Sequence, residues 1–259
     1  MRLKNARQFE ALRESGKRLA QVMDHVSERI AVGVSTGELD RVAEASMRDL
    51  GGVPVFKGYG KEHGNPFPAS ICTSINDEVV HGIPSGERTL KEGDVVKVDM
   101  GIRFDGMVTD MARTFPVGMI SDAAKRLLSA TEQSLLAGID AIRLGARLSD
   151  YARAVETMVK KRGFSAVRDL VGHGVGFELH EAPQIPNYVG SGLPDIVFRS
   201  GMAVALEPMI NAGGSDVRLA EDGWTFLSSD GSLSAHFEDT IIITDTGVEI
   251  VTRPSGENS

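Results

Sequence analysis

Acidic residues embedded in apolar, strand-like runs are the feature that most restricts how this chain can fold. The four runs are VVKVDMG (95–101) with Asp99, MVTDMART (107–114) with Asp110, MAVALEPMI (202–210) with Glu207 and HFEDTIIIT (236–244) with Glu238. An ionised carboxylate in such a place must shift its pKa or find a partner, because burying an unpaired charge is costly. The Lys and Arg residues within these runs are too few to pair four carboxylates, so metal ions are the favoured partners.

A histidine in a fifth run, LVGHGVG (170–176), adds an imidazole to this set. Oxygen ligands with one imidazole, here His173, suit manganese, iron, cobalt or zinc. Any one of the five residues alone could be a strand-end group facing water, but five together favour a metal site. Four carboxylates carry enough charge for two ions, and paired ions can activate water and polarise a carbonyl group. The pattern therefore predicts a metal-dependent hydrolase.

Composition limits the protein's class. A chain of 259 residues is long enough for one domain, and we expect residues 1–259 to form a single catalytic domain. The formal net charge of −8 argues against binding to nucleic acid or to an anionic membrane. Cys72 is the only cysteine, which excludes an intrachain disulfide and a thiolate zinc cluster. With no apolar stretch near the ~20 residues of a membrane span, we expect a soluble cytoplasmic protein.

Apolar residues at alternating spacings of three and four predict amphipathic helices in both halves of the chain. The predicted helices cover residues 9–30, 39–50, 121–144 and 149–162, with starts at Ser121 and Ser149 for the last two. Strand-like runs occupy most of the remainder. The sequence thus predicts a mixed α/β (α+β) fold.

The two halves of the chain resemble each other. KEGDVVKVDMG and RSGMAVALEPM each place an acid six residues after a glycine, while VVHGIP and ELHEAP each place a histidine, His81 or His180, three residues before a proline. We interpret this as an internal duplication, about residues 37–115 and 149–245. Coincidence is the alternative, because a glycine followed by a strand is a common local pattern.

Several separated motifs identify the family that the chain resembles. They are GHGVGFELHEAPQIPNY (172–188), ALEPMINAG (205–213), DGWT (222–225), AHFEDT (235–240), ICTSINDEVVHGIP (71–84) and GDVVKVDMG (93–101). In this order and spacing, from about Phe9 to Thr252, they resemble the type I methionine aminopeptidases. The resemblance implies a pita-bread fold, with two pseudo-symmetric halves around a curved, mainly antiparallel sheet and helices outside. It also implies removal of the initiator methionine from nascent polypeptides with a small second residue.

The resemblance assigns a role to each candidate ligand of two divalent metal ions (Co, Mn, Fe or Zn). Asp99 would bind one ion, and Asp110 and Glu238 would bridge both. His173 and Glu207 would complete the second site, with Glu207 also accepting a proton from the attacking water.

The same resemblance places further residues at the substrate. His180 would donate a hydrogen bond to the scissile carbonyl as it becomes an oxyanion, and His81 would lie near the peptide nitrogen. The pocket for the methionine side chain would be lined by Cys72, Trp224, Tyr59, Phe67 and Leu179. Leu179 and Phe67 could equally be ordinary core residues. His236, two residues before Glu238, is expected on the same strand face, in a supporting or substrate-facing position.

The sequence departs from the family at four places, one of which is the VTDMART frame of Asp110, where relatives more often have a glycine before the aspartate. Residues 60–67 resemble an insertion, which makes the placement of Tyr59 and Phe67 less certain. Asp239 stands where a histidine is usual, and Phe177 where a polar residue is common. These changes could alter the pocket or the metal affinity without altering the five ligands.

Three alternatives remain open at this point. The first is an Xaa-Pro aminopeptidase or dipeptidase of the same fold. The VTDMART sequence around Asp110 resembles those enzymes, but the short amino-terminal part and the motifs EPMINAG and DGWT argue against them. The second is a non-catalytic binding relative, although such proteins typically lose metal ligands. The third is a cysteine hydrolase built on Cys72, although nothing in the apolar ICTSI run marks a thiolate. We further expect a monomer that associates transiently with the ribosome.

Overall fold

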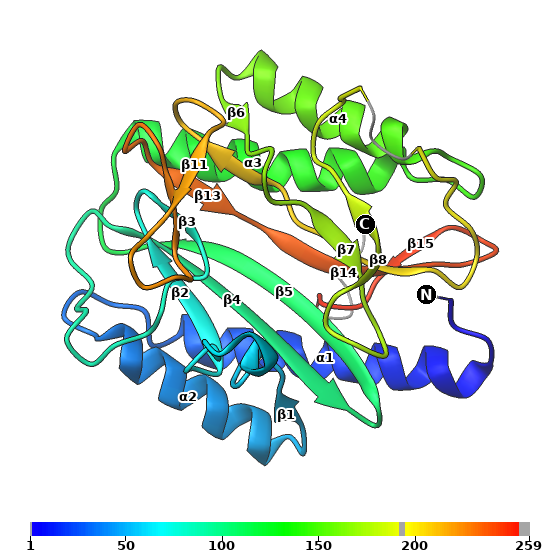
Figure 1. Ribbon diagram of the computed structural model, residues 1–259, viewed down its shortest axis with the longest axis horizontal. Coiled ribbons are helices and arrows are strands. Elements are labelled where there is room, and N and C mark those ends of the chain that lie inside the picture. Colours follow the sequence, from blue (N-terminus) through cyan, green and yellow to red (C-terminus); the bar gives the residue numbers. More distant parts are fainter. Residues whose placement is uncertain (1, 192–194, 254–259) are drawn as a thin grey trace.

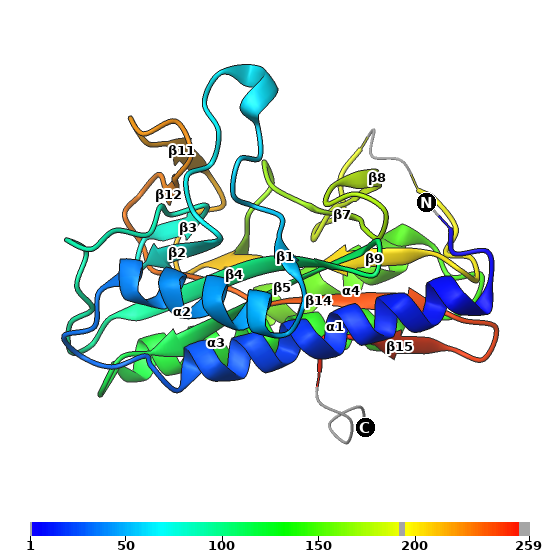
Figure 2. The same cartoon turned by 90° about the horizontal axis from the view of Figure 1, so that it is seen from below.

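The computed structural model describes residues 2–191 and 195–253. Its four α-helices lie along one face of a curved sheet, and loops and short strands lie over the other (Figures 1 and 2). The helices are α1 (Ala6–Ser27), α2 (Thr36–Asp49), the short 3-10 helix η1 (Lys61–His63), α3 (Asp122–Ala141) and α4 (Leu148–Lys161). None of the helices described has the length and apolarity needed to cross a membrane.

The four predicted α-helices are confirmed, with ends displaced by a few residues. Ser121 caps α3 as predicted, since its side chain accepts a hydrogen bond from the backbone N–H of Ala124. The predicted start of α4 at Ser149 is wrong by one residue. That helix begins at Leu148, and the Asp150 carboxylate accepts a hydrogen bond from the backbone N–H of Arg147.

Among the described residues, the central sheet has nine strands, and every pairing within it is antiparallel. Its path runs β1 (Val53–Pro54), β4 (Val95–Phe104), β5 (Met107–Pro116), β14 (Glu238–Ile243), β9 (Ala203–Leu206), β7 (Gly172–Gly174) and β8 (Glu181–Ile185), with β2 (Ile71–Ile75) on β4 and β15 (Val248–Ile250) on β14. Two smaller sheets hold β6 (Ser165–Ala166), β10 (Met209–Asn211) and β13 (Ser234–His236), and β3 (Glu78–Val80), β11 (Val217–Leu219) and β12 (Phe226–Ser228). The predicted mixed fold and antiparallel sheet are therefore confirmed, whereas the internal duplication stays a prediction.

Side chains alternate between the two faces of the central sheet. In β4, Val96, Val98 and Met100 pack in one core cluster with apolar residues of α1 and α2. Near the other end of the sheet, Val204 and Ile241 pack in a second cluster with α3 and α4. Because successive strand residues point to opposite faces, the helices take up one face and leave the other available for polar side chains.

The structure accounts for one departure from the family pattern, the aspartate at position 239. It is fully buried, and it follows Glu238 in β14, so the two side chains point to opposite faces of the sheet. Its carboxylate accepts hydrogen bonds from Arg113 at 2.6 Å, from Arg253 at 2.6 and 2.9 Å, and from the Thr252 hydroxyl at 2.9 Å. Asp239 therefore links the C-terminal residues to β14 and β5 on the face away from Glu238.

Removing this carboxylate should destabilise the fold strongly. We expect Asp239→Ala to lower the free energy of unfolding by about 3–5 kcal/mol, because two nearly buried guanidinium groups lose their anionic partner. Urea denaturation of the metal-free protein measures the change. Asp245→Ala, at an exposed position, is the control and should change stability by less than about 0.5 kcal/mol. Equal stabilities for the two variants would contradict the role given to Asp239.

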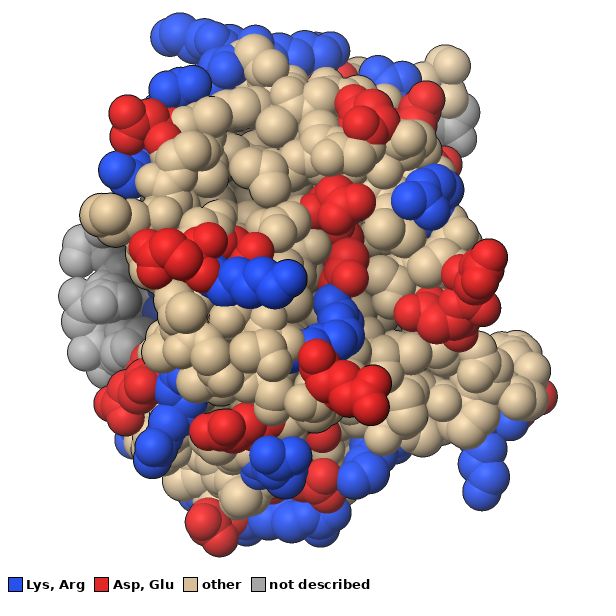
Figure 3. Space-filling model, turned by 90° about the vertical axis from the view of Figure 1, so that its left-hand side faces the viewer, with Lys and Arg blue, Asp and Glu red and all other residues tan. Residues whose placement is uncertain are grey.

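On the face of the molecule shown in Figure 3, acidic and basic side chains are interspersed among uncharged ones, and the loop that carries η1 projects at one edge (Figures 2 and 3).

Candidate metal centre and active site

Strand register brings three of the predicted acids to the free face of the sheet. Asp99 of β4 and Glu238 of β14 both pair with Ala112 of β5, one from each side. Directly opposed residues in antiparallel strands share a face, and so do residues two apart on one strand. Asp110, two residues before Ala112, therefore points to the same side as Asp99 and Glu238.

His173 reaches this face from the other half of the chain. It pairs with Ala205 of β9, and Glu207 follows Ala205 by two residues. The glycines on either side of His173 are needed because a Cβ would lie 2.5 Å from a carbonyl oxygen of β9 at Gly172 and 2.4 Å from one of β8 at Gly174. The GHG sequence thus lets β7 fit between its two neighbours and present the imidazole.

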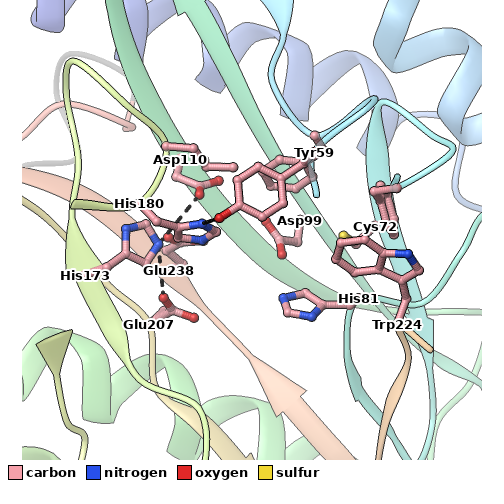
Figure 4. Close-up of a pocket in the computed structure, with 13 residues that line it drawn as sticks. Tyr59, Cys72, His81, Asp99, Asp110, His173, His180, Glu207, Trp224 and Glu238 are labelled. Carbon is pink, nitrogen blue, oxygen red and sulfur yellow. Dashed lines mark hydrogen bonds and ion pairs between the residues drawn. The ribbon is translucent and has the colours of Figure 1, made fainter. Parts of the chain in front are cut away.

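One cavity collects all the predicted site residues (Figure 4). It is lined by Phe56, Tyr59, Phe67, Cys72, His81, Asp99, Asp110, His173, Leu179, His180, Glu207, Trp224 and Glu238. Only Phe56 was missed by sequence reasoning, although it stands in the apolar VPVF run before the predicted insertion. The structure brings these residues together in one cavity, while their assignment as site residues and their individual roles stay predictions.

The polar end of the cavity has the geometry of a metal site. Asp110, His173 and Glu238 each offer a ligand atom, and these atoms lie within 4.8 Å of one another. Nε2 of His173 is 3.4 Å from Oε1 of Glu207 and 3.9 Å from Oδ2 of Asp110. One buried oxygen each of Asp99, Asp110 and Glu238 has no hydrogen-bond partner in the part of the chain that the structure describes. Such orphaned oxygens beside an imidazole fit divalent cations.

The electrostatics of the cluster support this fit. Burial raises the pKa of Asp99 to about 7. Burial and the neighbouring carboxylates raise the pKa values of Asp110, Glu207 and Glu238 well above the ordinary range. Four acids crowded together resist ionisation unless cations offset their charge.

The histidines of the cavity are neutral at physiological pH. Burial, and then the neighbouring His180, lowers the pKa of His173 to about 3 and that of His81 to about 4. Burial also lowers the pKa of His180. A neutral imidazole can bind a metal through one nitrogen, or donate one hydrogen bond while accepting another.

The other end of the cavity is apolar and aromatic. The Phe67 and Trp224 rings meet edge to face at 5.2 Å between centroids, and Phe56 meets Phe67 in the same way at 6.5 Å. Cys72 pairs with Asp99 in the sheet register and so shares its face. Burial raises the pKa of the Cys72 thiol well above its ordinary value, which is the opposite of what a thiolate nucleophile needs. The structure thus disfavours the cysteine hydrolase alternative.

The loop with residues 60–67 leaves the predicted aromatic residues in place. The Tyr59 hydroxyl lies 2.6 Å from Nδ1 of His180, and their rings meet edge to face. Phe177, by contrast, is exposed and does not line the cavity described above.

The prediction for His236 was wrong in part. The chain leaves β13 at His236 and enters β14 at Glu238, so these residues belong to different sheets and the alternation between them is broken. His236 does not line the cavity, but its Nε2 is 3.6 Å from Oε2 of Glu207. Of the two positions expected for His236, the structure therefore fits the supporting one and not the substrate-facing one.

Comparison with known proteins agrees with this geometry. The sequence pattern that defines metallopeptidase family M24 matches residues 10–245 of this chain. The chain is 46% identical over 250 residues to methionine aminopeptidase 1 of Bacillus subtilis (strain 168), covering 96% of this chain and 98% of that protein. The chain belongs to the methionine aminopeptidases of family M24.

Solved structures separate this family from its nearest rival. The crystal structure of methionine aminopeptidase from Thermotoga maritima has a TM-score of 0.92 and 40% identity, covering 98% of this chain and 100% of that one. Xaa-Pro dipeptidase from Bacillus anthracis gives a TM-score of 0.77 and 25% identity, and the match covers only 63% of its chain. The Xaa-Pro alternative is therefore less supported than membership of the methionine aminopeptidases.

Metal binding to this member of the family should release protons. We expect Mn²⁺ added to the metal-free protein to displace more protons at pH 6 than at pH 8, because the cluster carboxylates with raised pKa values hold more protons at the lower pH. His173 contributes none, since its pKa of about 3 leaves it unprotonated at both values. Calorimetry in buffers of different ionisation enthalpy measures the release. An equal or larger release at pH 8 would contradict this account.

Proposed function

We propose that this protein removes the N-terminal methionine from nascent proteins and peptides whose second residue is small. The observation that carries the proposal is a single cavity with a buried cluster of metal-ligand type at one end and an aromatic pocket at the other. The pocket of Phe67, Trp224 and Cys72 offers the apolar and aromatic surface that a thioether side chain prefers. The cluster offers the groups that hydrolyse the adjoining peptide bond.

Asp99 would hold one divalent ion, His173 and Glu207 would hold a second, and Asp110 and Glu238 would contribute to both. When bound, the ions would supply Lewis-acid activation of a water molecule and of the scissile carbonyl. Manganese, iron, cobalt and zinc all suit these ligands.

The chain's own side chains complete the reaction. Glu207 would accept a proton from the attacking water, and burial, with the nearby Asp99 and Asp110, raises its pKa well above the ordinary value. His180 would donate a hydrogen bond to the carbonyl oxygen as negative charge develops there, and His81 would lie near the peptide nitrogen. The aromatic pocket would hold the methionine side chain and exclude water.

Tyr59 is suited to fixing the tautomer of His180. A phenol that donates to Nδ1 of His180 leaves the ring proton on Nε2, the nitrogen that is free to face the substrate. His180 would then already be in the tautomer that donates from Nε2, so no free energy would be needed to change its tautomer during the reaction.

Removing the phenol should slow turnover. We expect Tyr59→Phe to lower kcat about fivefold with little change in KM, which corresponds to the ~1 kcal/mol of one hydrogen bond. Steady-state kinetics on a Met-Ala-Ser peptide measures the effect. Tyr188→Phe, outside this cavity, is the matched control and should keep the original kcat. A fall confined to KM would instead indicate that Tyr59 only lines the pocket.

Action on nascent chains would place the protein in the cytoplasm with transient access to the ribosome. We propose that it works there as a monomer.

Substrate choice tests the proposal directly. The purified protein, supplied in turn with Mn²⁺, Fe²⁺, Co²⁺ and Zn²⁺, should release methionine from Met-Ala-Ser, and exhaustive chelation should stop the release. Glu207→Ala should lower turnover by at least about 100-fold, whereas Cys72→Ser should keep the turnover number. Cleavage confined to Xaa-Pro peptides, or full activity after chelation, would refute the proposed function.

A further inference from the structure

A second histidine, behind the cavity, faces the same carboxylate as the metal-site histidine. His236 is 1% exposed, and neither of its ring nitrogens has a hydrogen-bond partner in residues 2–191 and 195–253. Its backbone is fixed on both sides by Thr114, whose hydroxyl accepts from the His236 N–H at 2.9 Å and donates to the His236 carbonyl at 2.7 Å. A rigidly held, fully buried imidazole with unpaired nitrogens requires a physical explanation.

Glu207 supplies that explanation, because its two carboxylate oxygens face different ways. Oε1 is 3.4 Å from Nε2 of His173 at the metal end of the cavity (Figure 4). Oε2 is 3.6 Å from Nε2 of His236, which lies outside the cavity lining. The second distance is just longer than a hydrogen bond, so a small rotation of the carboxylate would close it.

The ring of His236 is suited to donate in this direction. An imidazole carries an N–H on at least one of its two ring nitrogens. With that proton on Nε2, the ring is a donor that faces Oε2 of Glu207.

We propose that His236 is a positioning residue for Glu207, donating from Nε2 to Oε2 so that Oε1 stays directed at the metal centre and the attacking water. The inference rests on the proposed function for the role of Glu207. Hydrogen-bond partners of this kind, which hold a metal ligand from behind, typically change metal affinity or activity by about 10–100-fold when they are removed.

Two substitutions at His236 separate the hydrogen bond from the packing. We expect His236→Leu to weaken Mn²⁺ binding to the metal-free protein about 10–100-fold, and to lower kcat on Met-Ala-Ser at saturating Mn²⁺ without raising KM. His236→Gln keeps an N–H at similar reach and should stay within about threefold of the original protein, because the donated hydrogen bond is preserved. Calorimetry and steady-state kinetics provide the two readouts.

A double-mutant cycle tests whether His236 acts through Glu207. In the Glu207→Ala background, which leaves no acceptor for His236, His236→Leu should weaken Mn²⁺ binding no further, whereas independent structural effects would add. His25→Leu on α1, away from the cavity, is the matched control and should leave Mn²⁺ affinity unchanged. If His236→Leu does not fold, His236→Asn replaces it, since its shorter amide keeps polarity but cannot reach Glu207.

The outcomes distinguish this inference from the proposed function. Additive effects in the cycle, or unchanged Mn²⁺ affinity and kcat in the leucine and asparagine variants, would overturn the role of His236. Failure of the original protein to release methionine would overturn the proposed function instead, while the Mn²⁺ cycle would still report on the pairing of His236 with Glu207.

Discussion

The crowding of four carboxylates on one face of a sheet is the constraint on which the rest of the structure depends. Asp99, Asp110 and Glu238 share that face because each is linked in register or spacing to Ala112, and Glu207 joins them from the end of β9. Their mutual repulsion and desolvation oppose folding, so the surrounding structure must hold them in place. The helices do this by packing on the reverse face, where apolar side chains of β4, β9 and β14 are buried.

The two ends of the cavity divide the chemistry. The polar end is formed by buried acids, whereas the apolar end is built from aromatic rings in edge-to-face contact. His81 and His180 line the same cavity as both groups of residues. The rings of His180 and His173 pack edge to face, with 4.4 Å between their centroids. A substrate that fills the apolar end would therefore bring its adjoining backbone to the imidazoles and the metal ligands at once.

Much of this could be predicted from the residues, and the remainder could not for identifiable reasons. Acids inside apolar runs indicated the site because their burial is costly wherever the strands lie. The break between His236 and Glu238 could not be predicted, since a change of sheet at Phe237 depends on pairing with distant strands and not on local periodicity. The hydrogen bond between Tyr59 and His180 likewise joins residues far apart in the chain, and the loop that carries Tyr59 has no regular pattern.

The surroundings of Asp239, which the sequence analysis linked to the pocket or the metal affinity, could not be predicted either, for a related reason. Its partners, Arg113 and Arg253, come from β5 and from the end of the described chain, and only the folded sheet brings them together. Because side chains alternate along β14, Glu238 and Asp239 point to opposite faces of the sheet.

That alternation has a consequence for how such a protein can diverge. Consecutive residues of one strand meet different physical demands: Glu238 lies among the acids of the cavity, whereas Asp239 must match the arginines behind the sheet. Residues behind the sheet can therefore change as a matched set, here an aspartate with two arginines, while the residues of the cavity stay the same.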